Sequence, residues 1–70
     1  MEPVFFSYYD GRTGRIYYDK SYIKKRVGTS VILECGTSVR ADVVYTSEEA
    51  LIKRESRLSG KFYGYKPLHG

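Results

Sequence analysis

Aromatic rings interleaved with cations near the N-terminus are the side chains of this chain best suited to chemistry. Two tyrosine- and phenylalanine-rich segments, residues 4–9 and 16–18, flank a glycine-containing loop, and a basic run extends from Arg12 to Arg26. Cations neutralise phosphates, and flat rings let unpaired bases stack at roughly 1–3 kcal/mol per base. The pattern predicts a nucleic-acid-binding surface, whose candidate residues are Phe5, Tyr9, Arg12, Arg15, Tyr17, Lys24, Lys25 and Arg26.

The same rings fit a second interpretation. Tyr is amphipathic and common at protein interfaces. The chain could therefore be a small protein–protein interaction module, such as a regulator or inhibitor, or a subunit that pairs with a second copy through its Tyr-rich face. The expected partner is thus nucleic acid, with DNA and RNA both open, or a protein, with a homodimer as one form. Binding that weakens steeply with salt would favour nucleic acid.

Catalytic, metal and cofactor chemistry has few candidate residues. The loop Gly11–Gly14 lacks the length and the following Lys-Ser/Thr of a phosphate-binding loop. Cys35 stands in an apolar segment, as a small buried hydrophobe would. The single histidine, His69, cannot complete a metal site with one cysteine. We therefore expect no enzyme activity, no metal site and no cofactor.

Composition and charge place the chain among small basic globular domains. Its 70 residues are 41% hydrophobic and 29% charged, which is ordinary for one domain near the lower size limit of an unaided core. The net charge is +4, and six basic residues against one acid fall between residues 12 and 26. A second basic stretch, residues 51–70, follows a more acidic middle. Such asymmetry attracts polyanions.

The longest apolar run and the single cysteine bear on location. Val31–Leu33 is far too short to cross a membrane, and no secretory signal is visible. A lone cysteine cannot form an internal disulfide, so a reducing, intracellular setting is expected. We predict a cytoplasmic protein without a membrane partner.

A hairpin is expected to position the first aromatic residues. A three-residue loop, 12–14, with Gly14 in the left-handed conformation, would pair Tyr9 with Tyr17 and Tyr8 with Tyr18. This register places one set in the core, Val4, Phe6, Tyr8, Ile16 and Tyr18. It places the other set on a half-exposed face, Phe5, Ser7, Tyr9, Arg15, Tyr17 and Asp19. A four-residue loop would shift the pairing by one and mix the two sets.

The remaining elements follow from composition and turn signals. Residues 29–35 and 39–45 are rich in β-branched residues and predict two strands, while the connector 21–28 is open between edge strand, helical turn and loop. Thr46 and Glu49 fit a capping box that opens a helix, which Ser59-Gly60 would end. Residues 61–66 are either a last strand or an aromatic–basic arm, and 66–70 a flexible tail.

These elements predict a single small α+β domain spanning residues 1–70. We expect four or five strands, as an antiparallel sheet or an SH3-like small barrel, with one helix in the C-terminal half and the order β-β-β-β-α plus an optional last strand. The segment 19–28 resembles the small archaeal chromatin proteins of SH3-like fold, which is why the barrel is considered. Those proteins are richer in lysine and use a tryptophan on their DNA-contacting sheet. This chain has no tryptophan, so no functional residue is transferred.

Overall fold

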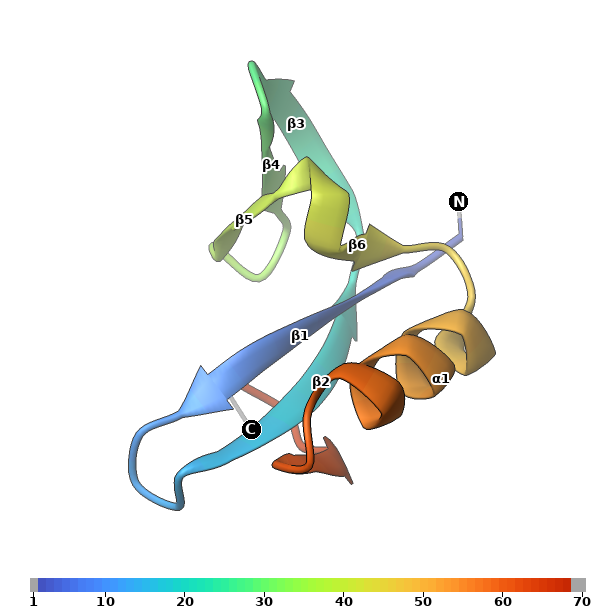
Figure 1. The fold of residues 1–70 in the computed structure, drawn as a ribbon. Helices are drawn as coiled ribbons and strands as arrows, with labels where there is room; N and C mark the ends of the chain where they lie inside the picture. The colour runs from blue at the N-terminus through green and yellow to red at the C-terminus, as the bar shows by residue number, and fades with distance from the viewer. Residues whose placement is uncertain (1, 69–70) are drawn as a thin grey trace.

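One helix and two small sheets form successive layers in the computed structural model, which describes residues 2–68 (Figure 1). Sheet A has the strand order β6-β1-β2-β7, and sheet B the order β3-β4-β5. The strands are β1 Val4–Asp10, β2 Arg15–Ser21, β3 Ile23–Val27, β4 Ser30–Leu33, β5 Ser38–Arg40, β6 Val44–Tyr45 and β7 Phe62–Tyr65, and helix α1 spans Glu48–Leu58. The predicted α+β class is confirmed. Strand β3 follows β2 directly into the second sheet, and the two sheets do not close into a barrel.

The loop of the β1–β2 hairpin has four residues, so the predicted register was wrong. Asp10 pairs with Arg15 and Tyr8 with Tyr17. The Asp10 carbonyl accepts a hydrogen bond from the Gly14 N–H at 2.8 Å, and its carboxylate accepts one from the Arg12 N–H at 2.9 Å. A side chain that bonds the backbone two residues ahead stabilises a turn. These two bonds hold the longer loop.

The one-residue shift moves every β2 side chain to the opposite face from the predicted one. Tyr17 now lies beside Tyr8, and Tyr18 lies on the helix side. Both Tyr17 and Tyr18 are only 6% exposed, because sheet B and the C-terminal segment cover one face of sheet A and α1 covers the other. The predicted half-exposed face of the hairpin therefore loses Tyr17 and Asp19, which are buried, while Phe5 and Ser7 are half-buried and Tyr9 is exposed.

The core between the two sheets consists of Val4 and Phe6 from β1 with Val31 and Leu33 from β4. Cys35 is half-buried and packs against this cluster, in line with its predicted role as a small hydrophobe. On the opposite side of sheet A, helix α1 packs against β1, β6 and β7, and Leu51 is its fully buried side chain.

Two predicted segments are organised differently from expectation. The connector 21–28, for which edge strand, helical turn and loop were all open, contains strand β3, which pairs antiparallel with β4. The predicted strand 39–45 is divided by a 3-10 helix, Ala41–Val43, which redirects the chain so that β6 leaves sheet B and pairs with β1. Strand β7 is confirmed as a last strand, but it runs parallel to β2.

Helix α1 begins one residue later than the capping box predicts. The cap is Ser47, whose hydroxyl accepts a hydrogen bond from the Ala50 N–H at 3.3 Å, and not Thr46. The helix ends at Leu58, with Ser59 as its C-cap, so the predicted stop is confirmed. No helix in residues 2–68 is long and apolar enough to cross a membrane.

Candidate nucleic-acid interface

The predicted binding residues are divided between two surfaces. Lys24, Lys25 and Arg26 lie on β3 in sheet B, at one end of the molecule in Figure 1. Tyr9, Arg12 and Arg15 lie at the hairpin end of sheet A, far from β3 in the same view. Phe5 is half-buried, and Tyr17 is buried. The structure therefore does not bring the eight residues together.

The ring of Tyr17 is enclosed by other side chains. Its centroid lies 6.2 Å from that of Tyr8 and 5.8 Å from that of Tyr63, and the Lys66 Nζ lies 4.9 Å from it. Its hydroxyl donates a hydrogen bond to the Thr13 Oγ1 at 3.3 Å. Tyr17 thus links the strands of sheet A and has no open ring face.

The outer surface of sheet B is formed by side chains that share one face of three strands. Residues directly opposite each other in an antiparallel pair lie on the same face. The β3–β4 and β4–β5 registers therefore define the sheet B surface, which consists of Lys25, Val27, Ser30, Ile32, Ser38 and Arg40. Val31 and Leu33 point the other way, into the core. Helix α1 lies on the far side of sheet A, so it leaves this surface uncovered (Figure 1).

Cations without acidic partners border the sheet B surface. Lys24, Lys25 and Arg26 are all exposed. The ion pairs within residues 2–68 are Arg40 with Asp42 at 3.1 Å and Lys66 with Asp10 at 2.6 Å. The three β3 cations are therefore not neutralised by a carboxylate of the described chain, and they are available to an external anion.

An exposed apolar side chain lies among these cations. Val27 ends strand β3 and is 49% exposed. Its neighbour across the sheet, Ser30, is small. The sheet B surface thus combines positive charge, small polar side chains and the exposed apolar side chain of Val27 within three short strands.

A second arrangement of an aromatic ring and a cation was not predicted from the sequence. The Arg15 guanidinium carbon lies 4.4 Å from the ring centroid of Tyr63, and Tyr63 is 67% exposed. The composition of residues 61–66 predicts either a last strand or an aromatic–basic arm. Its parallel pairing with β2, which brings Tyr63 to Arg15, could not be read from that segment.

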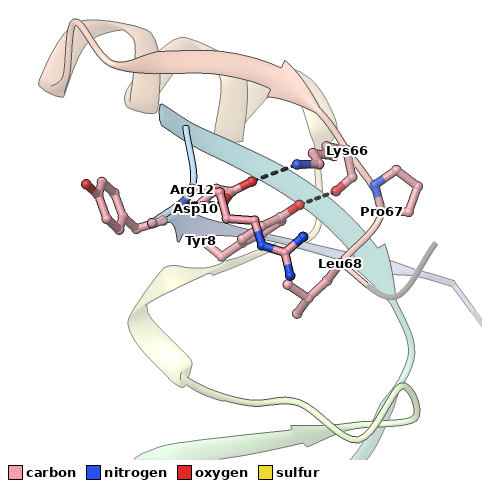
Figure 2. Close-up of a pocket in the computed structure, with 8 residues that line it drawn as sticks. Tyr8, Asp10, Arg12, Lys66, Pro67 and Leu68 are labelled. Atoms are coloured by element: carbon pink, nitrogen blue, oxygen red, sulfur yellow. Dashed lines mark hydrogen bonds and ion pairs between the residues drawn. The ribbon is translucent and has the colours of Figure 1, made fainter. Parts of the chain in front are cut away.

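A cavity of about 470 Å³ lies between the hairpin loop and the C-terminal segment. Figure 2 shows the Arg12 guanidinium reaching across it, above Tyr8 and toward Leu68. The Tyr8 hydroxyl donates to the Lys66 carbonyl at 2.6 Å, and the Lys66 ammonium donates to Asp10 at 2.6 Å. This last bond lowers the pKa of Asp10 and raises that of Lys66.

The predicted flexible tail is described only in part. Residues 66–68 lie against the sheet, since the Lys66 N–H donates to the Tyr18 carbonyl at 3.1 Å and the Leu68 N–H to the Asp19 carboxylate at 3.0 Å. His69 lies outside the described residues. Among residues 2–68, no group of three or more His, Cys, Asp or Glu side chains is placed to hold a metal ion.

Comparison with known proteins finds no protein-family model, no curated protein and no solved structure that matches this chain. The assignment of a function therefore depends on the geometry of the two surfaces.

Proposed function

We propose that this chain is a small nucleic-acid-binding module without catalytic activity, and that its main contact surface is the sheet B surface together with the cations of β3. The observation that carries the proposal is an uncovered sheet face that has Lys25 on it, with Lys24 and Arg26 exposed next to it on the edge strand β3. None of these three cations forms an ion pair within residues 2–68. A cytoplasmic location, expected from the single cysteine, belongs to the same proposal.

A double helix is the form of nucleic acid that this surface fits best. Adjacent strands lie about 4.8 Å apart, so three strands present a face about 10 Å across. The major groove of B-DNA is about 12 Å wide, and two-stranded and larger β structures are known to enter grooves. The small side chains of Ser30 and Ser38 leave room for close approach.

The exposed apolar group on this surface supports the same proposal. Proteins that bind grooves often place an apolar side chain against or between base pairs. Val27, at the end of β3, is the exposed apolar side chain of sheet B that could do so. Lys25 lies on the same face and would contact a phosphate from there, whereas Arg26 pairs with Val31 and so lies on the opposite face of the edge strand β3.

A titration of a labelled duplex at two salt concentrations tests the proposal. Each phosphate contact that is lost should reduce the slope of log affinity against log salt by about 0.9. We therefore expect Lys24→Ala combined with Lys25→Ala to weaken duplex binding and to reduce this slope by about 2. The matched control is Lys53→Ala combined with Arg57→Ala, which removes the same charge from exposed positions of α1 and should change the slope less.

Two results would contradict the proposal. Equal effects of both double variants would mean that only net charge attracts the duplex. No duplex binding, together with a dimer or larger species that persists in salt, would instead support a protein–protein interaction module.

A further inference from the structure

We infer that the outer edge of sheet A, at β7 and the start of β2, is a second binding surface and that it takes unpaired nucleotides. Its residues are Tyr63, Arg15 and Lys61, and we call it the β7 edge surface. The inference rests on the proposed function for the class of ligand, but it assigns a different surface and a different form of nucleic acid.

The exposed ring of Tyr63 packs against the buried rings of sheet A. Tyr63 meets the buried Tyr17 edge-on, with ring centroids 5.8 Å apart and planes at 64°. The row of rings continues through Tyr8 at 6.2 Å from Tyr17 to Phe6 at 6.4 Å from Tyr8. Phe6 is fully buried in the core. Because the row anchors Tyr63, little side-chain freedom remains to be lost when a ligand binds.

The guanidinium of Arg15 lies over this ring. The distance of 4.4 Å from the guanidinium carbon to the ring centroid is within the range of a cation–π contact. Aromatic rings and Arg guanidinium planes are the groups on which proteins stack unpaired bases. A base can therefore stack on the outer side of this pair or against the exposed part of the ring.

Cations for the phosphates lie next to the stack. The Ile16 N–H donates to the Lys61 carbonyl at 2.9 Å, which places Lys61 beside Arg15 along the paired strands. Neither Lys61 nor Arg15 forms an ion pair within residues 2–68. A ligand with flat rings and phosphates fits this combination better than an acidic peptide, which would use the charges but not the stacking pair.

The two proposed surfaces lie apart in the fold. In Figure 1 the hairpin of β3 and β4 is at one end of the molecule, and β7 is at the other, beyond β1 and β2. A duplex on the sheet B surface would leave the β7 edge surface accessible. The chain should therefore be able to hold a duplex and an unpaired segment at the same time.

The test compares a labelled oligothymidylate with a labelled duplex in the same buffer. Tyr63→Ala should weaken oligothymidylate binding roughly 5- to 150-fold, as expected for one lost stacking partner, and leave duplex binding unchanged. Tyr63→Phe keeps the ring and should retain both affinities. Arg15→Lys keeps the charge but loses the planar group, and it should weaken oligothymidylate binding.

Tyr65→Ala is the matched control. Tyr65 is 50% exposed on the same strand, but it packs against Tyr18 on the helix side of the sheet, with ring centroids 5.5 Å apart. This variant should leave oligothymidylate binding unchanged. A thermal melt of each variant shows whether it remains folded.

Several outcomes would overturn the inference. Duplex binding by the parent chain with no binding of oligothymidylate would do so and leave the proposed function unaffected. An equal loss of both ligands in Tyr63→Ala would mean a single shared surface, and it would also contradict the sheet B surface as the main duplex contact. Competition by poly-glutamate as effective as that by unlabelled oligothymidylate would assign the β7 edge surface to an acidic protein partner. Conversely, oligothymidylate binding that needs Tyr63, without any duplex binding, would support the inference and contradict the duplex role of sheet B.

Discussion

The hydroxyl of Tyr18 donates a hydrogen bond of 2.6 Å to the carboxylate of Glu48. Tyr18 lies in the middle of β2 and Glu48 is the first residue of α1, so this bond ties the helix to sheet A at its N-terminal end. A negative charge in the first helical turn is itself stabilising because of the helix dipole. Because side chains alternate along a strand, Tyr17 lies on the face of β2 opposite to the helix.

Tyr18→Phe is expected to destabilise the fold. The substitution removes a hydrogen bond to a charged acceptor while keeping the buried ring, which should lower the free energy of unfolding by about 1–2 kcal/mol. Urea denaturation followed by circular dichroism measures the loss. Tyr9→Phe, at a residue 62% exposed, is the control, and an equal loss in both variants would argue against a stabilising role for the Tyr18–Glu48 bond.

The same bond predicts how stability depends on alkaline pH. The hydrogen bond to Glu48, with burial and the charge of Glu48, raises the pKa of Tyr18 from 10.0 to about 12. A group whose pKa is raised in the folded state contributes its full stabilisation below the unfolded value and loses it as pH rises through the folded value. Stability should therefore decline between pH 10 and 12 through this group. In an absorbance titration of the tyrosines, Tyr18 should ionise last, near pH 12. In Glu48→Gln this last ionisation should move to lower pH. An unchanged ionisation would mean that another tyrosine produces it.

Acid should release the C-terminal segment. The hydrogen bond from Lys66, followed by that from the Arg12 N–H, lowers the pKa of Asp10 below its ordinary 3.8. The stabilisation is therefore present above pH 3.8 and is lost as pH falls through the lower folded value. Asp10→Asn should reproduce the release at neutral pH, with faster hydrogen exchange of the Lys66 N–H. If exchange at Lys66 is the same in this variant, the Asp10 contact does not hold the segment.

The hairpin loop depends on a glycine at one position and not at another. Gly14 has φ of 72°, a left-handed conformation that costs other residues about 1–2 kcal/mol. Gly14→Ala should lower the free energy of unfolding by this amount. Gly11→Ala is the control, because Gly11 does not have a positive φ and a Cβ there would meet no atom within 4 Å. Comparable losses in both variants would contradict the four-residue loop.

The exposed valine of sheet B should contribute to duplex binding. Covering the rest of the Val27 side chain would gain on the order of 1 kcal/mol, which is about fivefold in affinity. Val27→Ser should therefore weaken duplex binding by about that factor with little change in its salt dependence. Ile52→Ser, at an exposed apolar residue of α1, is the control. A steeper or shallower salt slope in Val27→Ser would indicate that it disturbs the neighbouring cations.

The sequence predicted the hairpin, both central strand regions and the helix, because each has local signals. It could not decide the hairpin register. The same loop residues are compatible with a three-residue and a four-residue loop. The observed four-residue loop is stabilised by the two hydrogen bonds that Asp10 accepts, and the observed register by the helix that covers Tyr18. Burial of both Tyr17 and Tyr18 follows from this tertiary arrangement.

The candidate surfaces were predictable to different degrees. The basic run Lys24–Arg26 is legible in the sequence, whereas its position on an uncovered sheet depends on β6 leaving sheet B after the 3-10 helix. The pair of Arg15 and Tyr63 joins residues 48 positions apart in the chain through a parallel strand pairing. Such a pairing has no local signal.

Contact between the sheet B surface and a duplex can be mapped residue by residue. A duplex would be titrated into the isotope-labelled chain and the backbone amide signals followed by NMR at moderate salt. If the sheet B surface binds the duplex, the largest shifts should fall on residues 24–32 and 38–40, with small shifts on helix α1. Shifts concentrated on α1, or none at a duplex concentration that saturates the anisotropy signal, would contradict it.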